Sequence, residues 1–437
     1  MGHLVGKDIY HKLGDKIDTL PFRVKKGEAL FNILKTLYST EEAELVVKMP
    51  HGLSLASQLE KATGFERSKL NSLLESLTTK GLVIDIWAGK RYLYMPSPMV
   101  IGIFEFTMMR TGDNLDSKKW AELFHDYMND DSSYEVNFGS GQKVSPMRAL
   151  PHEGTIIESD YTEILDYESA SAIVESHNKF SIGLCSCRHE KLHLGEKRCD
   201  VPLETCATFG ESADYMIRHN FAKSVSKTGM LENLARSKEM GLVFSCDNVK
   251  RNVSFLCQCC GDCCNLLLGI SKFGYPNIIV TSNFIANVNK GTCEGCGKCA
   301  KACPIGAIEM IPVKDPLLKI KKLPQINEEI CIGCGVCSLK CTKTGSLKLN
   351  KRKKRVIHPE TTFERVILQC LERGTLQHQM FGDPQKVTQK VMKGFVGGFL
   401  KLPPVKRALM SDILRSSFLE RAKKGATKQK KGYLLER

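Results

Sequence analysis

The sequence lacks any long run of apolar residues. No stretch of the 437 residues approaches the roughly 18 consecutive apolar residues that a membrane-spanning helix requires. Residues 1–20 carry charges throughout and contain no apolar core of the kind found in secretory signals. We therefore expect a cytoplasmic protein with no transmembrane segment.

Several common catalytic motifs are also absent. The sequence contains no phosphate-binding Walker loop, no G-x-G-x-x-G after a predicted strand, no H-E-x-x-H pair and no C-x₃-C-x₂-C run. These absences give no support to nucleotide-driven, dinucleotide-dependent or zinc-peptidase chemistry. The sequence thus predicts no acid, base or nucleophile with a catalytic role.

Cysteine, in contrast, is abundant. The chain has 19 cysteines, an odd number, and many of them are regularly spaced. In a reducing compartment disulfides are rare, and dense cysteines at regular spacing indicate metal or cluster ligands. We therefore expect the chemistry of this chain to lie in its thiols.

The length and charge distribution predict several domains with different surfaces. Apolar residues make up 42% of the chain and the net charge is +15. Residues 314–437 hold 28 Lys and Arg against 10 Asp and Glu, so the basic character belongs to the C-terminal third. Such a surface favours an acidic protein, an anionic membrane or nucleic acid, and does not choose among them.

Residues 25–96 have the pattern of a small helical module with a hairpin. Helical periodicity over 27–48 is followed by helix, turn and helix over 53–83, and then by alternation around a turn at 88–90. This order resembles a winged-helix domain, whose second helix commonly binds DNA. The corresponding helix, 66–80, is nearly neutral. Nucleic acid is therefore not the expected partner, and a protein-contact module is the preferred interpretation.

The whole chain is predicted to be an α+β, multi-domain protein. After the winged-helix-like domain (25–96) we expect a mostly helical connecting region (97–180), a helical cysteine-rich region (181–284), a ferredoxin-like region (285–350) and a basic helical tail (351–437). Residues 385–424 are amphipathic as helices. They favour peripheral contact with a membrane surface or an acidic partner, or else packing on the body of the protein.

Two matched cysteine runs follow residue 290, and both have the spacing C-x₂-C-x₂-C-x₃-C. In such a run three thiolates bind one [4Fe–4S] cluster, and the fourth cysteine reaches the other cluster. Zinc would need only two C-x₂-C pairs and would leave this order unexplained. By this rule one cluster is held by Cys293, Cys296, Cys299 and Cys341. The other is held by Cys331, Cys334, Cys337 and Cys303.

Residues 285–350 resemble the bacterial-type dicluster 4Fe–4S ferredoxin domain, on the runs "CEGCGKCAKACP" and "CIGCGVCSLKC". The resemblance implies a small two-fold fold and electron transfer. The second run departs from the family at Thr342, where proline is usual, and loses no ligand. With its winged-helix-like front, the chain as a whole resembles multi-domain 4Fe–4S ferredoxin-type proteins of anaerobic bacteria, a group that implies no substrate.

A second, irregular group of cysteines lies upstream and includes the run "CQCCGDCC" at 257–264. Adjacent side chains diverge, so these thiols cannot all face one metal. We expect at least one further Fe–S cluster, with structural zinc, a redox-active thiol site or buried free cysteine as alternatives. The candidate ligands are Cys185, Cys187, Cys199, Cys206, Cys257, Cys259, Cys260, Cys263 and Cys264.

Three functions fit these observations. The leading interpretation is an electron-transfer protein, or a subunit of an oxidoreductase, that carries two [4Fe–4S] clusters and a third Fe–S cluster and serves a redox partner protein. The basic tail would suit an acidic partner. The alternatives are a reductase whose active centre is the irregular cysteine site and a redox-sensing winged-helix regulator.

Overall fold

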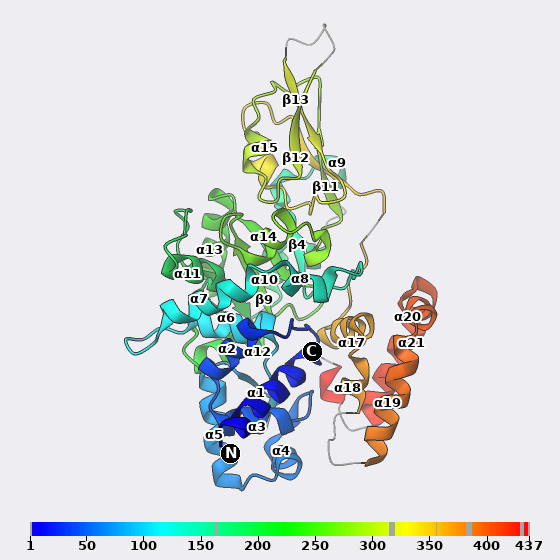
Figure 1. The fold of residues 1–437 in the computed structure, drawn as a ribbon. Coiled ribbons are helices and arrows are strands. Elements are labelled where there is room, and N and C mark those ends of the chain that lie inside the picture. The colour runs from blue at the N-terminus through cyan, green and yellow to red at the C-terminus, as the bar shows by residue number, and fades with distance from the viewer. Residues whose placement is uncertain are drawn as a thin grey trace.

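The computed structural model describes residues 2–161, 165–313, 320–354, 356–381, 387–428 and 432–435. Figure 1 shows a central sheet, a smaller unit of two strand pairs above it, and N-terminal helices below it. The C-terminal helices lie beside the N-terminal ones. Within the described ranges, every helix is too short or too polar to traverse a bilayer.

The N-terminal module consists of helices and a three-stranded antiparallel sheet in the order β1-β3-β2. Ser39 and Glu42 form a capping box at the start of its third helix. Its elements are α1 (Gly2–Asp18), α2 (Glu28–Leu37), α3 (Thr40–Lys48), β1 (Ser54–Leu55), α4 (Ala56–Thr63), α5 (Arg67–Thr79), β2 (Val83–Trp87) and β3 (Tyr92–Pro96).

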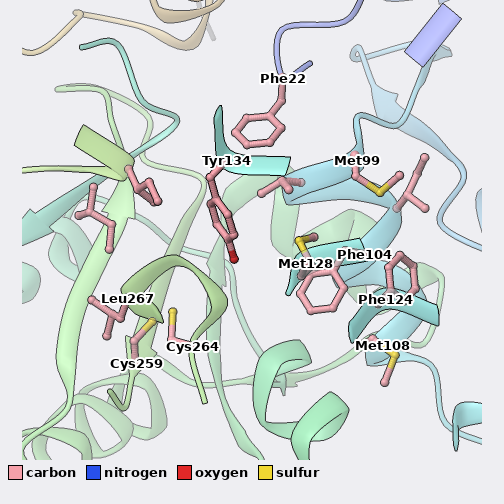
Figure 2. Close-up of a cluster of buried hydrophobic side chains, with 14 of the residues drawn as sticks. Phe22, Met99, Phe104, Met108, Phe124, Met128, Tyr134, Cys259, Cys264 and Leu267 are labelled. Atoms are coloured by element: carbon pink, nitrogen blue, oxygen red, sulfur yellow. The ribbon is translucent and has the colours of Figure 1, made fainter. Parts of the chain in front are cut away.

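A helical layer joins this module to the central sheet. It contains η1 (Met99–Ile103), α6 (Phe104–Met109), α7 (Ser117–Met128) and α8 (Asp131–Phe138). Most of its large buried side chains are aromatic residues and methionines, and Figure 2 shows Tyr134 between Met128 and the pair Cys259 and Cys264. The hydrophobic core of this layer is therefore continuous with the cysteine-rich region.

The central region is a seven-stranded sheet in the order β10-β4-β8-β9-β6-β5-β7. Only β10 and β4 are parallel, and the other neighbours are antiparallel. The strands are β4 (Met147–Leu150), β5 (Phe180–Leu184), β6 (Glu204–Phe209), β7 (Ala222–Val225), β8 (Val243–Asp247), β9 (Phe255–Cys259) and β10 (Ile279–Val280). The intervening elements are η2 (Glu153–Thr155), α9 (Glu158–Tyr161), η3 (Asp166–Glu168), α10 (Ala170–Glu175), α11 (Ser186–His193), α12 (Gly210–Arg218), α13 (Lys227–Glu239), α14 (Asn265–Ser271) and η4 (Pro276–Ile278).

The prediction of a helical region over 181–284 is therefore wrong in missing this sheet. Strands β4 and β8 are buried at every residue. A strand covered on both faces does not show the alternation of apolar and polar residues that identifies a half-exposed strand. The periodicity of the sequence therefore could not distinguish the short buried strands from the helical segments α11 to α14.

The region of the two regular cysteine runs consists of two antiparallel hairpin-like pairs, β11 with β14 and β12 with β13. A short helix contains the third cysteine of each run. The elements are β11 (Phe284–Val288), α15 (Lys298–Ala302), β12 (Ile308–Pro312), β13 (Lys322–Ile326), α16 (Val336–Leu339) and β14 (Leu347–Lys351). The two halves repeat one arrangement, with a run and its helix beside each strand pair.

The tail is helical, with its own small core. Its elements are α17 (Thr362–Arg373), α18 (Leu376–Met380), α19 (Val387–Lys401), α20 (Pro403–Met410), α21 (Asp412–Lys428) and η5 (Gly432–Leu434). Residues 355, 382–386, 429–431 and 436–437 of the predicted tail lie outside the described residues, as do 314–319 of the ferredoxin-like region.

Candidate metal centres

The first regular run forms a loop around a cavity of about 270 Å³. Cys293, Cys296 and Cys299 line this cavity, and so does Cys341 from the end of the second run. Burial raises the pKa of Cys299, and the neighbouring sulfurs of Cys293 and Cys341 add to the rise. The structure therefore brings Cys341 to the first run, although 42 residues separate it from Cys299 in the sequence.

The second group of regular cysteines has the same composition as the first, with three cysteines from one run and the fourth from the other run. Burial raises the pKa of Cys334 to about 12, with a further rise from the nearby sulfurs of Cys331 and Cys303. Cys337 has a strongly raised pKa for the same reasons. The amide of Ala307 also donates to the Cys303 sulfur at 3.2 Å. Cys303 of the first run thus lies with the three leading cysteines of the second.

Glycines between these cysteines are required by close packing. Gly295, Gly333 and Gly335 all have positive φ, at 67°, 68° and 83°. A Cβ atom would lie 2.4 Å from the Lys322 carbonyl at Gly295 and 2.1 Å from the Phe284 carbonyl at Gly333. Only glycine fits these loops as they curl around the thiols, and the four-thiol donor sets suit an iron–sulfur cluster.

The two groups differ in their exposure. Cys296 of the first group is exposed, whereas Cys331, Cys334 and Cys337 of the second are buried. The second run packs on the central region, because the amide of His152 donates to the Cys334 carbonyl at 3.0 Å. One group thus lies near the surface, and the other lies at the junction with the body of the protein.

The loop that carries several of the irregular cysteines contacts this junction at Gly261. A Cβ atom on Gly261 would lie 2.9 Å from the Pro304 carbonyl and 3.1 Å from its Cα. Pro304 directly follows Cys303. The loop "CQCCGDCC" is therefore in contact with the chain that carries the second group of regular cysteines.

Strand pairing, together with the starts of α11 and α14, assembles six of the irregular cysteines into one chain of contacts. Cys206 on β6 lies beside Cys257 on β9, because Ala207 pairs with Leu256 in the antiparallel register. Cys185 follows β5, and its amide donates to the Leu203 carbonyl at 2.7 Å. The successive thiol contacts run Cys185, Cys206, Cys257, Cys259, Cys264 and Cys187. We call these residues the six-thiol group.

The six-thiol group lines a second, larger cavity of about 870 Å³. Hydrogen bonds from Cys257 and Cys264 lower the pKa of Cys259 to about 5. Hydrogen bonds from Cys185 and Cys257 likewise hold the pKa of Cys206 well below its usual value. Much of the remaining wall is apolar, and Figure 2 shows part of this surrounding core next to Cys259 and Cys264. The other four thiols of the group, Cys185, Cys187, Cys257 and Cys264, have strongly raised pKa values. The group therefore combines closely coupled thiols with an apolar space of ligand size.

The other three irregular cysteines lie apart from the six-thiol group. The Cys199 sulfur is 3.6 Å from that of Cys260 and 3.7 Å from that of Cys263. None of the three borders the larger cavity. We call Cys199, Cys260 and Cys263 the three-thiol group. The structure thus divides the nine irregular candidates into two sets, a division that the spacing of the sequence did not reveal.

Glu105 is a residue of the larger cavity that sequence reasoning missed. Burial raises the pKa of its carboxyl group to about 7, and the amide of Gly102 donates to it at 2.9 Å. It lies in a region without cysteine, so no local pattern linked it to the thiols. Only the packing of α6 against α11 brings it there.

Comparison with known proteins identifies one part of the chain. Residues 292–344 match the family model of the 4Fe–4S dicluster domain. No curated protein and no solved structure matches the chain. Residues 292–344 therefore form a dicluster domain of ferredoxin type, which confirms that resemblance and gives the chain an iron–sulfur, electron-transfer role.

Proposed function

We propose that the chain is an electron-transfer protein that carries two [4Fe–4S] clusters in residues 285–350. The observation that carries this proposal is the place of Cys341, in the cavity formed by the first run. One-electron transfer is the chemistry that such clusters supply when bound. One cluster would be held by Cys293, Cys296, Cys299 and Cys341. The other would be held by Cys331, Cys334, Cys337 and Cys303.

We propose that a redox partner docks near the first run and that the protein's own acceptor or donor lies in the central region. Cys296 is exposed, which suits contact with a partner. The second run is buried against the central region, and Gly261 contacts Pro304 there. Gly261 lies two residues after Cys259 and three before Cys264, which both belong to the six-thiol group. We therefore propose a further Fe–S cluster in the six-thiol group, near the end of the relay.

Anaerobic purification tests the proposal. We expect about eight irons and eight sulfides per chain from the dicluster domain alone, and about four more from a further cubane. Stepwise reduction followed by EPR should show two interacting clusters. A colourless protein, or fewer than about eight irons per chain after reconstitution, would contradict the proposal.

The larger cavity favours a second candidate function, reduction of a small apolar molecule. Its volume of about 870 Å³ lies in the range of ligand sites, and the six-thiol group borders it. On this hypothesis Cys259→Ser abolishes turnover while the dicluster domain can still be reduced. Cys263→Ser, in the three-thiol group, provides the comparison. Unchanged turnover in the Cys259 variant would contradict a reductase centred on this cavity.

We propose that the N-terminal module is winged-helix-like and contacts protein rather than DNA. Its helices and its three-stranded sheet support the first part. For the second part, the basic side chains of α5 and its C-cap each pair with an acidic side chain. The pairs are Arg67 with Glu60, Lys69 with Glu41, and Lys80 with Glu42. Few charges of this helix are left for phosphates, so a redox-sensing DNA regulator has little support.

We further propose that α19 contacts an anionic membrane surface. Val391, Phe395 and Phe399 follow one another at helical spacing and are 67%, 79% and 55% exposed. The tail that carries them is strongly basic, although Lys393 and Lys401 of the same helix lie on the side near His378. An exposed apolar face on a basic tail suits insertion among anionic headgroups.

A further inference from the structure

The spacing of the three-thiol group is that of ligands around a single metal ion. A tetrahedral zinc ion with Zn–S bonds of about 2.3 Å separates its thiolate sulfurs by about 3.8 Å. Cys199 lies 3.6 Å from Cys260 and 3.7 Å from Cys263, sulfur to sulfur. The observed separations therefore agree with one shared ion.

The same measure separates this group from the cluster cysteines. The described ranges hold many potential ligand atoms of His, Cys, Asp and Glu. Only in this group do three or more of them all lie within 4.8 Å of one another. The thiols of the dicluster domain are more widely spread, as expected where each sulfur binds a different iron of a cubane. The three-thiol group is thus compact in a way that its neighbours are not.

Arg188 supplies the charge that such a site requires. Its side chain is fully buried, and it donates to the Pro202 carbonyl at 3.0 Å and to the hydroxyl of Thr205 at 2.6 Å. Its guanidinium lies near Cys185 and Cys259 of the six-thiol group and contacts Cys260 of the three-thiol group. No ion pair with an Asp or Glu is found for it in the described part of the chain. A buried cation needs a compensating anion, and three thiolates with one divalent ion carry a net charge of −1.

We propose that Cys199, Cys260 and Cys263 bind one divalent metal ion in a tetrahedral site, with Zn²⁺ as the favoured ion and a non-protein ligand in the fourth position. Thiolate ligands suit zinc, and three protein ligands with an external fourth are typical of open zinc sites. The ion would join the segment between α11 and β6 to the loop after β9. Val201 and Leu242 form an apolar wall beside it. This site does not depend on the electron-transfer proposal.

Metal analysis of the full chain, purified anaerobically from medium with both zinc and iron, tests the site. We expect about one zinc per chain in the wild type. Cys199→Ser and Cys263→Ser should lose that zinc and keep the iron content of the wild type. Cys246→Ala is the matched control, since Cys246 is buried in β8 of the central sheet and its thiol donates only to the Asp247 carbonyl among the bonds described. It should keep both metals.

X-ray absorption at the zinc edge of the wild type provides a test that needs no variant. We expect three sulfur neighbours at about 2.3 Å and one oxygen or nitrogen at about 2.0–2.2 Å. Loss of about one iron rather than zinc in the Cys199 variant would support the single-ion site with Fe²⁺ as its metal. Loss of about four irons, a zinc shell of four sulfurs, or no metal that depends on Cys199 would overturn the proposal.

Discussion

Replacement of Gly333 by alanine should selectively damage the half of the dicluster domain that faces the body. Gly333 has a φ of 68°, and a Cβ atom there would lie 2.1 Å from the Phe284 carbonyl and 2.3 Å from the hydroxyl of Ser282. The left-handed conformation costs an alanine about 1–2 kcal/mol. Overpacking against the β11 backbone adds about 1–3 kcal/mol, so we expect a total destabilisation of about 2–5 kcal/mol.

Gly306→Ala is the matched control for this substitution. Gly306 has the same φ of 68° and lies just after Cys303, but nothing approaches within 4 Å of its Cβ position. It should therefore incur only the conformational cost of about 1–2 kcal/mol. Thermal bleaching of the cluster absorbance measures both, and the Gly333 variant should bleach roughly 5–20 °C below the control. Equal midpoints for the two variants would refute the steric reasoning.

Three further predictions concern other parts of the chain. Cys341→Ser should lower the iron content by about four per chain, and Cys370→Ser, buried in the tail core, should not; equal iron in both would contradict the crosswise ligand sets. Phe395→Glu should weaken flotation with anionic vesicles roughly tenfold or more, and undiminished flotation would exclude α19 as the contact. Burial opposes ionisation of Glu42, but hydrogen bonds from Lys80, Ser76 and Ser39 outweigh it and lower its pKa. Its stabilisation is thus present above the unfolded pKa near 4.5 and is lost as the pH falls through the lower folded value. Glu42→Gln should cost about 1–3 kcal/mol at pH 7 and less in acid, as measured by urea unfolding, and a difference that does not vary with pH would contradict this.

The regular cysteine runs could be predicted from the sequence because their geometry is local. Four cysteines within eleven residues, with glycines between them, leave the backbone few ways to curl. Even the place of Cys341 beside Cys293 follows from the general ligand rule for such runs. The match of residues 292–344 to the dicluster family confirms the type of domain, and the ligand sets stay a prediction.

The central sheet could not be predicted in the same way. Its strands are four to six residues long apart from the two-residue β10, and β8 is buried at all five of its positions. In the sequence, β6 begins 20 residues after the end of β5, and β9 begins 46 residues after the end of β6, yet the three strands pair side by side. Periodicity within one segment carries no information about such partners, so the helices between the strands dominated the prediction.

The division of "CQCCGDCC" between two sites follows from where β9 ends. Within the strand, side chains alternate, so Cys257 and Cys259 face the same side and join Cys206 in the six-thiol group. The strand ends at Cys259, and the chain then turns past Gly261, whose contact with Pro304 leaves no room for a side chain. The turn directs Cys260 and Cys263 toward Cys199, and Cys264 returns to the six-thiol group as the N-cap of α14. The end of a strand and the contact with a distant segment therefore divide five cysteines in eight residues between two thiol groups, which is what our two metal proposals require.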